Sequence, residues 1–142
     1  MTDDRFVFHL LHMAHQAARD VFASELTPTQ FVVLKALYEI GDGTNQKTLI
    51  DHTGVDRSTM TDVLRRLEEN GLVTRARSKD DQRAVSVAMT KQGRYAYHLA
   101  VDAAEMANHA LLSQIPESQR KAFLRNLEGI GKVAAEAARA AA

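Results

Sequence analysis

Residues 54–73 read GVDRSTMTDVLRRLEENGLV, and this stretch decides how the rest of the chain is interpreted. One set of its apolar residues recurs at the spacing of a single helical face: Met60, Val63, Leu64 and Leu67. Asp56 is a suitable N-cap, because its carboxylate can accept hydrogen bonds from the free amides of a first turn. Gly71 suits the left-handed residue that commonly ends a helix. The stretch therefore predicts a capped amphipathic helix.

The opposite face of this helix is polar and carries Arg57, Ser58, Thr61, Asp62, Arg65 and Arg66. Short hydroxyl side chains let a helix backbone come close to a partner, and arginines beside them can reach phosphates or guanine edges. The pattern is that of a recognition helix for the major groove of DNA. A surface helix with solvated charges stays open as the alternative.

Composition favours one compact domain or two small lobes that share a core. The chain has 142 residues, of which 45% are hydrophobic and 25% charged, and its formal net charge is zero. Residues 44–94 contain ten Lys and Arg and seven Asp and Glu, which gives this segment a net charge of +3. The positive excess thus lies on the segment that holds the predicted recognition helix, although it is too small to identify a nucleic-acid binder alone.

The sequence also limits the compartment. It contains no cysteine, which excludes disulfides and thiolate metal sites. No apolar run reaches the length of a membrane span, and acids follow Met1 where a signal peptide would carry basic residues. We expect a cytoplasmic protein that has no membrane partner.

Periodicity and turn residues predict the other elements. Thr27, Pro28 and Gln30 form a capping box with proline at the first helical position. Thr44 is expected to cap the short helix that follows. Helices are expected over residues 3–24, 28–40, 44–52, 91–114 and from 117 onward, and strands over 72–77 and 84–89.

The two predicted strands would form a hairpin, with residues 78–83 as its polar loop. Because an isolated two-stranded hairpin is marginally stable, one side of it should rest on the helices while the loop projects. The candidate contacts to the minor groove and to phosphates are the basic residues of this hairpin: Arg75, Arg77, Lys79 and Arg83. The helix at 44–52, the turn at Thr53 and Gly54, and the recognition helix fit a helix-turn-helix.

The first predicted helix is unusually apolar around its circumference. Two stripes of apolar residues run along it, which favours burial on more than one side. A partner subunit is one source of that cover, and packing within one subunit is the other.

Three segments together resemble the MarR family of bacterial transcriptional regulators: LTPTQF at 26–31, LEENGLVTR at 67–75, and DQR at 81–83 followed by MTKQG at 89–93. The resemblance covers essentially the whole chain. It implies a mainly α fold with a small β-hairpin wing, in which residues 27–90 form a winged helix-turn-helix and residues 1–26 and 91–142 form a helical dimerisation region.

The resemblance further implies a homodimer that binds double-stranded DNA at a pseudo-palindromic operator, as a repressor or activator modulated by a small aromatic or amphipathic effector. By position, the residues facing the major groove would be Ser58, Thr59, Thr61, Asp62 and Arg65. Arg83 would enter the minor groove, with Asp81 orienting it. Asp62 could accept from cytosine, or hold Arg65 or Arg66.

Three histidines, His9, His12 and His15, follow one another at intervals of three on the first helix. Neighbouring pairs could share a ligand. Metal binding would need further ligands, and none has metal-binding spacing, so no metal site or cofactor is predicted. If an effector occupies a crevice beside the DNA-binding region, the residues expected to line it are His9, His12, Gln16 and Tyr38.

Two other functions compete with DNA-binding regulation. One is a helical dimeric adaptor whose wing contacts protein, and the other is a metal-responsive regulator that uses the N-terminal histidines. An enzyme is not expected, because the sequence has no phosphate-binding glycine loop, no metalloprotease motif and no convergent acid–base set.

Overall fold

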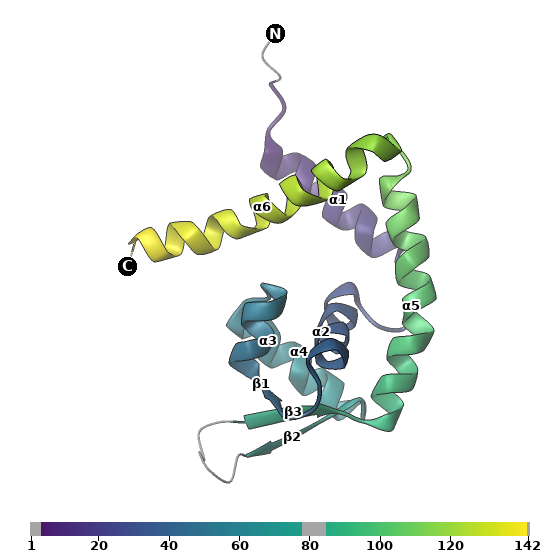
Figure 1. Ribbon diagram of the computed structural model, residues 1–142, viewed down its shortest axis with the longest axis vertical. Helices are drawn as coiled ribbons and strands as arrows, with labels where there is room; N and C mark the ends of the chain where they lie inside the picture. Colours follow the sequence, from purple (N-terminus) through teal and green to yellow (C-terminus); the bar gives the residue numbers. More distant parts are fainter. Residues whose placement is uncertain (1–3, 78–84, 142) are drawn as a thin grey trace. The chain divides into compact units, whose positions relative to one another are not determined.

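The computed structural model describes residues 4–77 and 85–141. Over these residues the order of elements along the chain is α1 (Val7–Val21), α2 (Pro28–Ile40), β1 (Thr44–Asn45), α3 (Gln46–Thr53), α4 (Arg57–Glu69), β2 (Val73–Arg77), β3 (Val85–Met89), α5 (Lys91–Leu112) and α6 (Glu117–Ala141). The chain divides into two compact units, residues 1–111 and 112–142. The mainly helical architecture with a small antiparallel sheet is the predicted one (Figure 1).

Helix α2 begins as predicted. The Thr27 hydroxyl accepts from the amide of Gln30 at 3.1 Å, and the Gln30 side chain accepts from the amide of Thr27 at 2.9 Å. Pro28 follows the cap, where its missing N–H costs no helical hydrogen bond.

The cap of α3 was predicted one residue too early. Thr44 is buried and lies in β1, paired with Val87 of β3, so its backbone belongs to the sheet. Asn45 is the N-cap instead, and its side-chain oxygen accepts from the amide of Thr48 at 2.8 Å. The reason is that Asn45 still has extended backbone, which leaves its short amide side chain beside the first turn.

Over the described residues, the sheet has three strands in the order β1-β3-β2, not the two strands expected. Val73 pairs with Met89 and Arg77 with Val85 in the predicted hairpin. Strand β2 begins at Val73, one residue later than expected; the expected start of β3, Ala84, lies outside the described residues. Strand β1 pairs with β3 and extends the hairpin to a three-stranded sheet. This pairing stabilises a hairpin that would be marginally stable as two strands alone.

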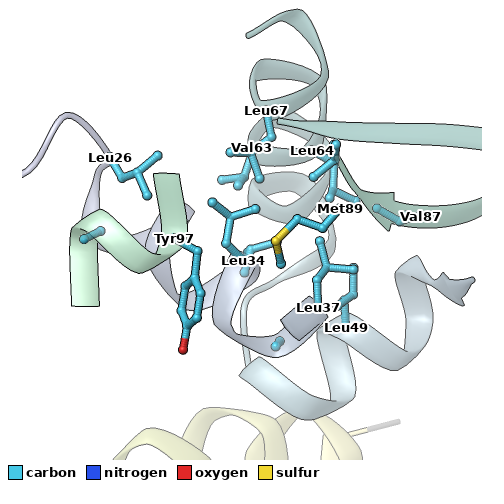
Figure 2. Packing of buried hydrophobic residues seen from close by; sticks show 14 of the residues in the cluster. Leu26, Leu34, Leu37, Leu49, Val63, Leu64, Leu67, Val87, Met89 and Tyr97 are labelled. Atoms are coloured by element: carbon cyan, nitrogen blue, oxygen red, sulfur yellow. The ribbon is translucent and has the colours of Figure 1, made fainter. Parts of the chain in front are cut away.

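One hydrophobic core joins α2, α3, α4 and the sheet. Leu34, Leu49, Met60, Leu64 and Leu67 are fully buried. Figure 2 shows these leucines beside Val87 and Met89 of β3, so the apolar side of the hairpin closes the core that the helices form. The apolar stripe predicted for residues 54–73 is therefore the stripe that faces the core.

The start of α5 lies very close to the end of α4. The Thr90 hydroxyl donates to the carbonyl of Gly71 at 2.7 Å and accepts from the amide of Gly93 at 3.0 Å, so it caps the first turn of α5. A Cβ on Gly93 would lie 2.0 Å from the backbone oxygen of Leu72. Only glycine fits at this contact, and the contact holds α5 against the turn that follows α4.

Helices α1 and α6 differ from the core helices. No residue of α1 is buried, and the helix is shorter than expected, because it spans Val7–Val21 and not 3–24. The break expected between residues 114 and 117 is present: α5 ends at Leu112 and α6 begins at Glu117. None of the described helices combines the length and apolar character needed to cross a bilayer.

Candidate nucleic-acid interface

Helix α4 has the caps that its sequence predicts. The Asp56 carboxylate accepts from the backbone amide of Thr59 at 3.0 Å and from the Thr59 hydroxyl at 2.6 Å. These two bonds, the hydroxyl bond first, hold the pKa of Asp56 below its usual value. At the other end, Gly71 adopts a φ of 73°, and the amide of Leu72 donates to the carbonyl of Leu67.

The hydroxyl groups on α4 are partly engaged within the protein. Thr59 contacts Asp56 at the cap. Thr61 donates to the carbonyl of Arg57 at 2.9 Å and accepts from the side chain of Gln46 on α3 at 2.8 Å. Gln46 was not among the predicted site residues, because a contact between residues 15 positions apart leaves no signal in the sequence pattern. It fixes the outer face of α4 against the helix that precedes it.

The central arginines of α4 are paired with acids of the same helix. Arg65 donates through Nη2 to Asp62 at 2.6 Å and through Nη1 to Glu69 at 2.8 Å. Arg66 Nε lies 3.1 Å from the second oxygen of Asp62. Asp62 therefore holds both arginines, which is one of the two roles left open for it.

This pairing shifts the ionisation of its members. The hydrogen bond from Arg65, followed by the charge of Arg66, holds the pKa of Asp62 below its usual value. Asp62 and then Glu69 raise the pKa of Arg65. Helical spacing predicts both pairs of Arg65, since residues three or four positions apart are neighbours on a helix surface.

The hairpin positions its basic residues unequally. Arg75 of β2 is half-buried and donates through Nη2 to Glu68 of α4 at 2.9 Å, so it links the strand to the recognition helix. The same bond lowers the pKa of Glu68. Arg77 is exposed at the end of β2. Lys79, Asp81 and Arg83 lie outside the described residues, so their predicted contacts to the minor groove remain predictions.

The residues expected to line an effector site have different surroundings in the structure. His9, His12 and Gln16 are exposed on α1. The Tyr38 ring packs against Tyr97 and His98 of α5, with centroids 4.9 and 5.3 Å away. Among the described residues, no cavity is lined by these four side chains together, and their contact with an effector stays a prediction. Within residues 4–77 and 85–141, no three His, Asp or Glu side chains are grouped as metal ligands.

A cavity of about 720 Å³ does connect α1 with α4. Its walls include His15 and Arg19 of α1, Phe22 after that helix, and Asp62 and Arg66 of α4. The sequence singled out His15 for its spacing, but only the folding of residues 22–30 back along α4 brings it near the recognition helix. A ligand in this cavity would touch the acid and the arginine that α4 also uses in its own pairing.

The fold and the site define a class of protein. A short helix, a turn at Gly54, a helix with an outward basic face and a following antiparallel hairpin make a winged helix-turn-helix, which is a nucleic-acid-binding architecture. A MarR family model matches residues 26–85. The relative YwoH of Bacillus subtilis, an HTH-type transcriptional regulator, is 32% identical over 123 residues, which are 81% of this chain and 88% of the relative.

The chain belongs to the MarR family and is a DNA-binding transcriptional regulator, not an enzyme. The HTH-type transcriptional repressor Rv2887 of Mycobacterium tuberculosis is 28% identical over 136 residues, 92% of this chain and 97% of that protein. The regulator TtmR of Methylorubrum extorquens is 38% identical over 89 residues, and this match covers 62% of the chain but 45% of TtmR.

A solved structure resembles the chain over nearly its whole length. BpsR of Bordetella bronchiseptica is 28% identical, with a TM-score of 0.82 over 94% of this chain and 98% of BpsR. That structure describes how 6-hydroxynicotinic acid regulates the DNA binding of BpsR.

Proposed function

We propose that this chain is a homodimeric repressor that places two copies of α4 in successive major grooves of a pseudo-palindromic operator. The observation that carries the proposal is the division of α4 into two faces. Met60, Leu64 and Leu67 are fully buried, while Arg57, Arg65 and Arg66 are exposed. Such a helix is fixed by the core on one side and presents donors to base edges and phosphates on the other.

The dimer is supported by apolar side chains that the chain leaves exposed. On α1 they include Phe8, which is 74% exposed, and Met13. On α6 they are Phe123, Leu124, Leu127, Ile130 and Val133. Contiguous apolar faces of this kind mark association surfaces. A second copy that covers them would make residues 1–26 and 91–142 the dimerisation region and leave residues 27–90 free to meet DNA.

Two similar proteins support the proposal that the chain represses transcription and that an effector relieves the repression. Rv2887 is named a repressor, and BpsR responds to 6-hydroxynicotinic acid. In this chain the cavity beside His15, Arg19 and Arg66 is a candidate site for a small aromatic acid, because its cations can bind a carboxylate. Such a ligand would act on the recognition helix directly. The proposed work on bacterial DNA also implies the cytoplasm as the place of action.

The test is selection of binding sites from a pool of random duplexes by the full chain. We expect an enriched inverted repeat with half-site centres about 10 base pairs apart, and a salt slope of several units, because each dimer neutralises several phosphates. Binding without sequence preference would overturn operator recognition, and no binding at all would favour an adaptor. Arg83→Ala should lower the affinity of the protein for the selected duplex without changing the melting temperature of the protein.

The effector is tested with 6-hydroxynicotinic acid as the probe. If the cavity takes aromatic acids, the compound should raise the melting temperature and weaken binding to the selected duplex, and Arg19→Gln should reduce both effects. A probe that leaves both quantities unchanged would remove this class of acid from the proposal while leaving operator binding intact.

A further inference from the structure

In the protein without DNA, the two central arginines of α4 already form hydrogen bonds or ion pairs with acidic side chains of the same helix. Arg65 has both terminal nitrogens engaged, one by Asp62 and one by Glu69. Asp62 uses its two oxygens on two different arginines, Arg65 and Arg66. The formal charges of these four residues sum to zero, so the middle of the recognition helix has no net positive charge.

We propose that Asp62 is a specificity-determining residue, which orients Arg65 and Arg66 and withholds their charge from DNA of random sequence. The inference rests on the proposed function, because it concerns how α4 distinguishes an operator from other duplex DNA. Asp62 would then be a positioning residue that acts through the two arginines.

The physical reason lies in the difference between the contacts that a phosphate and a guanine offer to an arginine already paired with Asp62. A phosphate offers an arginine much the same ionic contact that Asp62 already supplies, so exchanging one for the other gains little. A guanine edge offers two acceptors in fixed positions, which a correctly oriented guanidinium meets bidentately. A guanidinium has five N–H donors, of which the two acids take two from Arg65, so donors remain for a base. The pairing thus weakens contact with random DNA more than contact with the matching base.

Asp62 carries more of this role than Glu69. Among the described residues, Glu69 pairs with Arg65, whereas Asp62 joins both arginines and also lines the cavity beside α1. Its side chain is 48% exposed, similar to the 50% of Arg65, so the pairs lie at the surface where DNA can compete for them. Within the part of the chain that the structure describes, loss of the Asp62 carboxylate leaves Arg66 without an ion pair and Arg65 paired with Glu69, while the buried side of α4 is untouched.

The experiment compares Asp62→Asn with the wild-type chain on two duplexes, one enriched from random DNA by the wild-type protein and one of shuffled sequence. We expect affinity for the shuffled duplex to rise about fivefold at 0.1 M salt and the salt slope to steepen by about two units, as for one added phosphate contact from each protomer of the dimer. The ratio of the two affinities should fall about tenfold.

Two variants serve as controls. Asp51→Asn removes the same charge from α3, where the carboxylate is exposed, and should leave the ratio of affinities unchanged. Asp62→Glu restores a carboxylate and should recover most of the ratio. Equal ratios for Asp62→Asn and wild type, or the same loss in Asp51→Asn, would overturn the inference.

A double-mutant cycle separates positioning from a direct contact of Asp62 with a base. In an Arg65→Gln, Arg66→Gln background, Asp62→Asn should no longer change the ratio, because the groups it positions are absent. An additive loss would instead show that Asp62 contacts DNA itself. If the wild type enriches no sequence, the proposed function fails, yet the salt slope on shuffled DNA still decides whether Asp62 masks the arginines: equal slopes contradict the inference.

Discussion

The winged region and the two terminal helices use apolar residues in opposite ways. In the winged region, Leu34, Leu49 and Leu64 are completely buried by neighbours from the same chain. On α1 and α6, residues of the same chemical type, such as Phe8 and Leu127, are 74% and 40% exposed. The comparison indicates that one region has a complete core, whereas the other helices have apolar faces that the single chain does not cover.

This difference has a thermodynamic consequence. Stability of the winged region is set by burial within one chain, so it should not depend on protein concentration. Stabilisation that comes from covering α1 and α6 with a second copy would depend on concentration by mass action. The two regions can therefore be separated by substitutions that affect one and spare the other.

The largest effect is expected in the core. Leu64→Ala removes a fully buried side chain of α4 and should lower the free energy of unfolding by about 2–5 kcal/mol. The measurement is urea unfolding at two protein concentrations, with Leu99→Ala as the matched control, since Leu99 is 62% exposed. Equal losses in the two variants would contradict the division between a buried and an exposed apolar set.

The contact between α5 and the turn after α4 offers a sharper test with two opposite signs. In Gly93→Ala the new methyl group would collide with the carbonyl oxygen of Leu72, at 2.0 Å, and we expect a loss of about 1–3 kcal/mol. In Gly129→Ala on α6, nothing lies within 4 Å of the new methyl group, and the better helix propensity of alanine should stabilise by about 0.5–1 kcal/mol. Thermal unfolding of both variants checks the signs, and a stabilised Gly93→Ala protein would refute the close approach.

An intermediate effect is expected on the uncovered faces. Phe8→Asp and Leu127→Asp should each weaken dimerisation by about 1–2 kcal/mol or more, because a charge would enter the apolar contact. Light scattering during gel filtration measures this as a shift from twice 15.7 kDa toward a single chain on dilution. The buried core should remain folded in circular dichroism, and unchanged dimers would place the interface elsewhere.

Much of the winged region could be predicted from the sequence because its signals are local. The caps at Thr27 and Asp56 and the glycine end of α4 depend on residues within one or two turns, and all three are present. The third strand could not be predicted, since β1 has two residues and its pairing with β3 joins positions about forty apart. The same limit explains why the sequence predicts Thr44, and not Asn45, as the cap of α3.

For the candidate site too, the sequence predicts the features that depend on nearby residues and misses the contacts between distant ones. The polar face of α4 follows from helical periodicity, and its ion pairs from spacings of three and four. The link from Arg75 to Glu68 and the bond from Gln46 to Thr61 come from tertiary folding. The cavity at His15 also depends on how residues 22–30 return along α4, so the sequence identified a histidine series without its surroundings.

The smallest expected effect concerns the cap of α4 and its dependence on pH. Because the pKa of Asp56 is lower in the folded chain than its ordinary 3.8, its contribution is complete above that value and is lost as the pH falls through the folded pKa. Asp56→Asn keeps a capping oxygen but has no charge, so at pH 7 it should be slightly less stable than the wild type. Below pH 4 the wild type should lose this contribution while the variant does not, so their melting temperatures should converge in acid. Since Asp56 belongs to the winged region, the convergence should be independent of protein concentration, and a concentration dependence would assign the acid sensitivity to the uncovered helices instead.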